Sequence, residues 1–294
     1  MASEVKDMKI LKALSTRPDK KDMVPDNHAL LKIFCALVII VLICIAIGHY
    51  AFKNGELTCD HYILNTYLYV ILAIMLIFIL ILLNDKYGIF NGLLDFFFYN
   101  SPNPLLSFII MLVLIIGLSY AIVHIPAQNI IASNAVWLLL VVLISLLLIP
   151  SIYFGRVSGV VGIAGLITVG IVVATGLVGY YYGDTLVKFD WDFYLTWALI
   201  AWIVIFMLGM FIVKTPTEMV NFIYVMAIAS LIIFILLLVS YFKTLKQNAN
   251  KCVDGTVVPN YPLESWSLVI KMVNVFVDMI RILGIRKSIR KMRR

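Results

Sequence analysis

Apolar runs of about 20 residues recur along the chain and are separated by shorter polar stretches. About 20 apolar residues are needed for a helix to cross the hydrocarbon core of a bilayer. Only helices and closed barrels satisfy the backbone in lipid, and the alternation of barrel strands is not visible. The pattern therefore predicts an all-α, polytopic membrane helix bundle with 7–8 transmembrane helices. The eight runs are 29–52, 62–83, 105–126, 135–154, 159–182, 192–214, 219–242 and 264–283.

The polar stretches define the domain organisation. Residues 1–28 are polar and mixed in charge, which predicts a disordered cytosolic tail. Residues 29–283 form the helical transmembrane domain, and residues 284–294 form a basic cytosolic tail. Between the helices, residues 84–104 mix apolar and aromatic residues and predict a short helix in the membrane interface, whereas 243–263 predict a polar loop.

The amino-acid composition also indicates a membrane protein. Hydrophobic residues make up 63% of the 294 residues and charged residues only 13%, whereas a soluble domain has about a quarter of its residues charged. The main partner is therefore the lipid bilayer. The net charge of +7 comes from basic residues near the two ends. That placement indicates membrane topology, with anionic lipid headgroups as candidate ligands of the basic tails, and no nucleic-acid partner.

The distribution of Lys and Arg predicts the orientation. If both termini are cytosolic and all eight runs span, most of the 23 basic residues lie on the cytosolic side. An integral protein of the endoplasmic reticulum or another internal membrane is expected. If 264–283 instead lies on the membrane surface, the basic C-terminus faces the side opposite to the N-terminus.

The same topology places two cysteines on one non-cytosolic side. Cys59 follows the first helix and Cys252 precedes the last one. Disulfides persist in such compartments, so a Cys59–Cys252 disulfide is one interpretation and two free thiols are the other. Cys35 and Cys44 fall within the first helix as apolar residues. No spacing of Cys and His indicates a metal site, and no cofactor is expected.

The last apolar run carries a line of polar residues. At 100° per residue they fall within an arc of about 100° and their charges sum to zero. This polar line comprises Glu264, Ser267, Lys271, Asn274, Asp278 and Arg281. A narrow, charge-balanced line favours a spanning helix packed inside a bundle over a helix lying on the surface. Asp278 and Arg281 are three residues apart, and Asn274 and Asp278 four apart, so both pairs are expected to touch.

Two interpretations of the polar line remain open. Charged residues within a bilayer cost about 2.5–3.5 kcal/mol each on insertion scales. They could form a conduit or a proton- or cation-sensitive gate, or they could fix the register of the helix. No nucleophile–base set is visible, so no catalytic residues are predicted and the protein is not expected to be an enzyme.

The stretch LVIKMVNVFVDMIRILG, residues 268–284, resembles the last helix of the Bax inhibitor family, also called the transmembrane Bax-inhibitor-motif or lifeguard proteins. The matching positions are Asn274, Phe276, Arg281 and Gly284, within a shared apolar frame. LLKIF at 30–34 and residues 103–121 are similar to the family's first and third helices. The resemblance implies a seven-helix fold and a modulator of ion homeostasis and cell death.

The chain departs from this family at the sensor. The family's sensor is a pair of aspartates, one in the last helix and one near the end of an earlier helix. The aligned positions here are Lys271 and either Lys243 or Lys214. Two lysines repel each other and do not bind calcium, so a family-type calcium leak gated by that pair is not expected. Asp278, two turns further on from Lys271, is a candidate substitute charge.

The sequence therefore leaves three hypotheses for the function. The first is a non-enzymatic, multi-pass modulator resembling the Bax inhibitor family. The second is a structural membrane protein whose basic tails bind a partner or anionic lipid. The third is a small transporter or channel that uses the polar line of the last helix.

Overall fold

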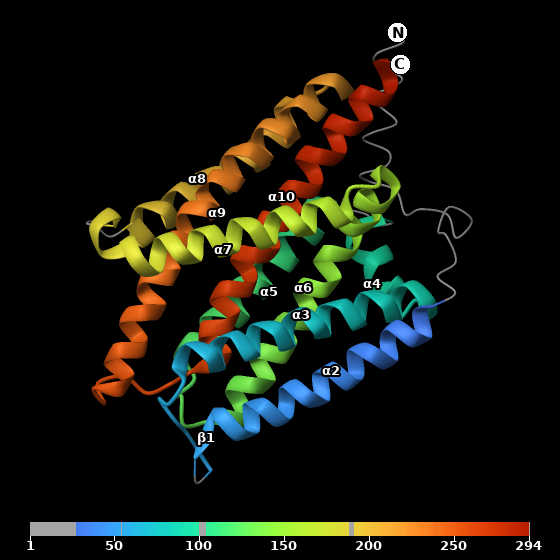
Figure 1. The fold of residues 1–294 in the computed structure, drawn as a ribbon. Helices are drawn as coiled ribbons and strands as arrows, with labels where there is room; N and C mark the ends of the chain where they lie inside the picture. The colour runs from blue at the N-terminus through green and yellow to red at the C-terminus, as the bar shows by residue number, and fades with distance from the viewer. Residues whose placement is uncertain (1–27, 54, 100–103, 188–190, 294) are drawn as a thin grey trace. The chain divides into compact units, whose positions relative to one another are not determined.

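The computed structural model describes residues 28–53, 55–99, 104–187 and 191–293 (Figure 1). The expected tail at 1–28 lies, except for its last residue, outside the described residues. Within the described ranges there are nine α-helices, one π-helical turn and a two-stranded hairpin. The helices are α2 (Ala29–Tyr50), α3 (Tyr62–Tyr87), α4 (Asn91–Leu94), α5 (Pro104–His124), α6 (Ile130–Ser158), α7 (Val161–Leu186), α8 (Trp191–Ile212), α9 (Pro216–Val253) and α10 (Tyr261–Arg293). The π-helical turn η1 is Asp95–Tyr99, and the strands are β1 (Phe52–Lys53) and β2 (Glu56–Leu57).

The predicted fold class is confirmed. Each of the eight apolar runs coincides with one long helix. In the part of the chain that the structure describes, six helices are long and apolar enough to cross a membrane: α2, α3, α6, α7, α8 and α9. In α5, the stretch Ile109–His124 is apolar but shorter than these six helices. Helix α10 is long enough but more polar than the other long helices.

The prediction of a loop at 243–263 is wrong for the first half of that stretch. Helix α9 continues without a break to Val253. The reason is local, because the stretch from Lys243 to Val253 contains Lys, Gln, Asn and Ala but no Gly or Pro. The helix ends where Gly255 adopts a φ of 72°. At the other end of the chain, α10 extends through the basic segment as far as Arg293.

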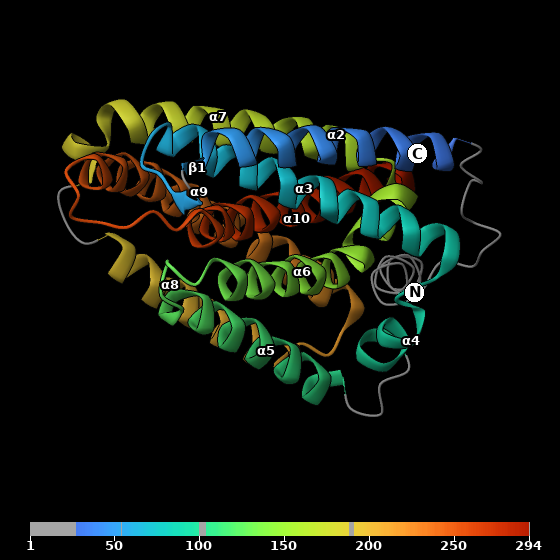
Figure 2. The same cartoon turned by 90° about the horizontal axis from the view of Figure 1, so that it is seen from below.

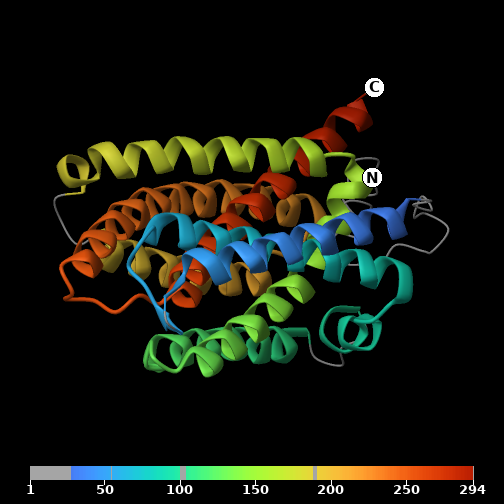
Figure 3. The same cartoon turned by 60° about the horizontal axis from the view of Figure 1, so that its bottom comes forward.

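The chain divides into two compact units, and α6, α9 and α10 each contribute to both. One unit contains 28–149 and 245–270 of the described residues. Here α2 lies alongside α3 (Figures 1 and 2). The hairpin β1–β2 joins these two helices, and the short turn of α4 and η1 follows the end of α3 (Figure 3). Most side chains of α2 are exposed and apolar, as expected for a helix that faces lipid.

The other unit contains 150–244 and 271–293 of the described residues. Its packing depends on small residues, because glycine lets helix backbones approach closely. A Cβ added at Gly179 of α7 would lie 2.6 Å from the Val239 carbonyl oxygen and 2.7 Å from Phe242 Cβ, both in α9. Gly183, one turn further along, lies against the stem of Lys243. The glycine face of α7 therefore fits closely onto α9.

The close contact between α7 and α9 can be tested by two substitutions in α7. Gly179→Ala should destabilise the protein by about 1–3 kcal/mol, because the new methyl group overlaps the backbone of α9. Gly170→Ala is the matched control, since a Cβ at Gly170 meets nothing within 4 Å. The control should be neutral or slightly stabilising, because alanine loses less conformational entropy than glycine. Unfolding in mixed micelles measures both, and equal effects of the two substitutions would contradict the close α7–α9 contact.

Candidate functional site

The N-terminal part of α10, Tyr261–Ile270, is surrounded by other helices of its unit. None of its residues is exposed. Its polar side chains form hydrogen bonds with α5 and α6. Trp137 Nε1 of α6 donates to Ser265 Oγ at 2.9 Å, and Trp266 Nε1 donates to Ser119 Oγ of α5 at 3.1 Å. This end of α10 is thus fixed by directional bonds as well as by apolar packing.

Glu264 begins the polar line, and its carboxylate is held from two sides. Tyr62 Oη of α3 donates to Glu264 Oε1 at 2.9 Å, and Asn248 Nδ2 of α9 donates to the same oxygen at 2.8 Å. Hydrogen bonds to a charged acceptor are stronger than neutral ones. The carboxylate therefore ties together α3, α9 and α10 within this unit.

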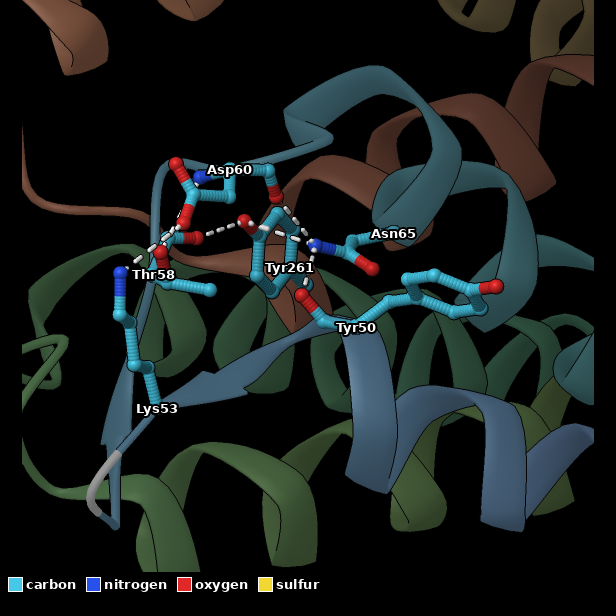
Figure 4. Close-up of polar contacts among 6 residues, drawn as sticks. All are labelled: Tyr50, Lys53, Thr58, Asp60, Asn65 and Tyr261. Carbon is cyan, nitrogen blue, oxygen red and sulfur yellow. Dashed lines mark hydrogen bonds and ion pairs between the residues drawn. The ribbon is translucent and has the colours of Figure 1, made fainter.

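A second polar group, which we call the Asn65 hub, lies at the start of α3 (Figure 4). Asn65 is fully buried, and its Nδ2 donates to the carbonyl of Tyr50 at 3.0 Å, to the carbonyl of Asp60 at 2.9 Å and to Tyr261 Oη at 3.3 Å. Tyr261 Oη in turn donates to the carbonyl of Thr58. Tyr50 ends α2, so one side chain satisfies a helix-terminal carbonyl and fixes the loop into α3.

The structure brings Cys59 and Cys252 together as a disulfide, across a sequence separation of 193. Cys59 is half-buried and Cys252 is 2% exposed. Cys59 stands between Thr58 and Asp60, both of which belong to the Asn65 hub. The ion pair between Lys53 and Asp60, at 3.7 Å, is exposed and adds little stability. Cys35 and Cys44 in α2 are free and exposed.

The C-terminal part of α10, in the other unit, holds the remaining polar line. Asp278 is 2% exposed, and its Oδ1 lies 3.8 Å from Arg281 Nη1, one turn further on. The hydroxyl of Ser230 of α9 also hydrogen-bonds to the Asp278 carboxyl group. The second carboxyl oxygen is buried without a hydrogen-bond partner in the described structure. A buried carboxylate requires neighbours such as Arg281 and Ser230, because burial of an unpaired charge is costly. Asn274 is half-buried on the same helix, as is Ser267 in the other unit.

The three lysines that the sequence predicts to align with the family's aspartates each have a defined environment. Lys271 Nζ lies 5.1 Å from the centre of the Tyr241 ring, a cation–π distance. Lys243 Nζ donates to the carbonyl of Val187 at 2.7 Å, just past the end of α7. A cation at a helix C-terminus interacts favourably with the helix dipole. Lys214 lies exposed beyond the end of α8.

The other matching positions of α10 pack against small residues. Gly165 of α7 faces Phe276, at 3.9 Å from the position of an added Cβ. An added Cβ on Gly284 would lie 2.5 Å from the ring of Phe154 of α6. Both positions are thus determined by the packing of α10 within its unit.

The sequence identified α10 but not its partners. The amides of Asn65 and Asn248 and the hydroxyl of Tyr261 are central to the hydrogen bonding, and none was singled out. A buried amide such as Asn65 inside an otherwise apolar span was an available signal. Among the described residues, no group of three or more His, Cys, Asp or Glu side chains could hold a metal ion.

These features define a polytopic helical membrane protein whose last helix carries a polar line that is buried at Asp278 and half-buried elsewhere. A family model described as "Inhibitor of apoptosis-promoting Bax1" matches residues 59–288. The chain therefore belongs to the Bax inhibitor family, as the resemblance of α10 predicted. A search of curated proteins finds no match to the chain.

The Asn65 hub can be tested by removing one hydroxyl. Tyr261→Phe should lower the free energy of unfolding by about 1–3 kcal/mol, because the half-buried Thr58 carbonyl and the buried Asn65 amide each lose a partner. Tyr120→Phe in α5 is the control, because that side chain is 65% exposed and its change should cost little. Unfolding in mixed micelles gives both values. A Tyr261→Phe protein as stable as the control variant would show that the hub is not important for stability.

Proposed function

We propose that this protein is a non-enzymatic modulator of ion homeostasis or cell-death signalling in an internal membrane, and that it acts through α10. The observation that carries the proposal is that no residue of the polar line is exposed, since Asp278 is buried and the other five are half-buried. Glu264, Asp278 and Arg281 are not placed toward lipid as isolated charges but have polar partners from α3, α9 or α10 itself. Family membership supports the general role. The expected endoplasmic reticulum location, with cytosolic termini, is part of the same proposal.

The mechanism we propose differs from that of a paired-aspartate sensor. The predicted aligned positions are Lys271 and either Lys243 or Lys214. Lys271 faces an aromatic ring and Lys243 a helix-end carbonyl, whereas Lys214 is exposed. None of these groups binds calcium. The remaining buried acid of this part of α10 is Asp278, whose charge is balanced by Arg281. We therefore assign the functional charge to the Asp278–Arg281 pair, without calcium as its ligand.

A structural role is the second candidate, because every charge described above has a partner that could simply hold α10 in register. The basic end of α10 supports a related idea. Arg286, Lys287 and Arg290 lie on its last turns, and Lys287 Nζ donates to the Gly159 carbonyl at 3.1 Å. Such a cluster at a helix end suits anionic lipid headgroups on the cytosolic face.

Cation flux in liposomes separates these functions. If the polar line carries the activity, the reconstituted protein leaks cations, and Asp278→Asn or Lys271→Leu lowers the leak. A change of about 1.4 kcal/mol in the barrier alters the rate about tenfold. The matched controls are Asp192→Asn and Lys32→Leu, which change the same residue types at exposed positions and should leave the leak unaltered.

A different set of results would favour the structural role. A wild-type protein that leaks no more than empty liposomes, together with misfolding of Asp278→Asn, would favour the structural role. Size-exclusion chromatography of each variant reports on folding independently of flux. A leak that is unchanged in a well-folded Asp278→Asn variant would remove the polar line from the mechanism.

A further inference from the structure

The two cysteines of the Cys59–Cys252 disulfide differ in their exposure to solvent. Cys252 lies in the last turn of α9 and is 2% exposed. Cys59 lies in the loop before α3 and is half-buried. In thiol–disulfide exchange, a thiolate attacks one sulfur along the S–S axis, and access decides which sulfur is attacked. Cys59 is therefore the more exposed side of the disulfide.

The surroundings of Cys59 favour such an approach. An open hollow on the hairpin is lined by Thr58 and Asp60, the two chain neighbours of Cys59, and also by Lys53. The Lys53 side chain is 71% exposed and its ammonium group lies 3.7 Å from the Asp60 carboxylate, so the hollow is polar and open to solvent without a net charge from this pair. The hairpin loop is held independently of the disulfide, because Tyr261 binds the Thr58 carbonyl and Asn65 binds the Asp60 carbonyl.

The Cys252 side is held differently. The connection from α9 to α10 is exposed from Val253 to Thr256. Within this stretch the Thr256 backbone N–H and hydroxyl both donate to the Lys251 carbonyl at 2.9 Å, which holds it to the end of α9. A bond to another helix follows at Asn260, whose Oδ1 accepts a hydrogen bond from Ser133 at 3.3 Å. Between Cys252 and Asn260 the disulfide is therefore the main tie of this connection to the hairpin.

We propose that Cys59 is a site of reversible thiol modification, and that exchange there releases the α9–α10 connection while the Asn65 hub stays intact. The partner is a thiol reductant, such as glutathione. Its thiolate attacks Cys59 Sγ, the bond to Cys252 Sγ breaks, and the electron pair leaves on Cys252 Sγ, which takes up a proton.

A mixed disulfide then remains on Cys59. A second glutathione thiolate attacks the glutathione sulfur of this adduct, so that glutathione disulfide forms and Cys59 leaves as a thiolate. Two electrons have then passed from two glutathione molecules to the protein. The proposal concerns a regulatory site and does not depend on the function assigned to the polar line.

The test uses the intact native disulfide in the full chain. Cys35→Ser and Cys44→Ser remove the two free thiols of α2, so that any adduct reports on the disulfide alone. The purified protein is treated with reduced glutathione and quenched with acid, and the adducts are located by mass spectrometry. We expect the Cys59 adduct to exceed the Cys252 adduct by about tenfold or more, because of its access. Equal adducts, a Cys252 adduct in excess, or no reduction by glutathione would each overturn the proposal.

Limited trypsin digestion tests the structural consequence in the same samples. Lys251 precedes Cys252, whereas Lys53 lies in the hairpin on the Cys59 side. Reduction should speed cleavage after Lys251 by about tenfold, because local opening controls proteolysis, and leave cleavage after Lys53 unchanged. An equal increase at both sites would mean that the hub itself opens, and no increase at Lys251 would mean that the connection is not released. Either result would overturn the proposed selective release.

Discussion

A polar group that enters the apolar interior of a membrane protein must find its partner inside the protein, because lipid offers none. This requirement organises α10. In one unit, Glu264 receives hydrogen bonds from Tyr62 and Asn248. In the other, Asp278 has Arg281 and Ser230. Each bond joins α10 to another helix or to its own next turn. The polar residues that raise the free energy of inserting α10 into the bilayer therefore also determine its register against the neighbouring helices of each unit.

Close approach of the helices is the second condition for this arrangement. A short side chain such as Ser230 reaches a carboxyl group on another helix only if the two backbones lie near each other. Glycines supply that proximity in the same unit, where Gly179 faces α9 and Gly165 and Gly284 face the aromatic rings of Phe276 and Phe154. The apolar packing and the polar bonding of this unit thus depend on each other.

The sequence predicted the helices well because the length and apolarity of a span follow directly from the bilayer. It predicted the end of α9 poorly, since the polar residues after Lys243 are compatible with either a loop or a helix in water. The polar line followed from periodicity alone. Its partners did not, because Tyr62, Asn248 and Ser230 lie on other helices, and pairing across helices is a property of the tertiary structure.

The residues by which α10 matches the family are largely those that pack it. Phe276 and Gly284 fit against Gly165 and Phe154, and Arg281 lies beside Asp278. Lys271, which the resemblance of α10 predicts to align with a sensing aspartate of the family, faces an aromatic ring of α9. Packing positions are constrained by neighbours on several helices, whereas a sensor residue is constrained by the ion that it senses. The packing of α10 is thus compatible with a lysine at this position, because Lys271 has Tyr241 as its partner.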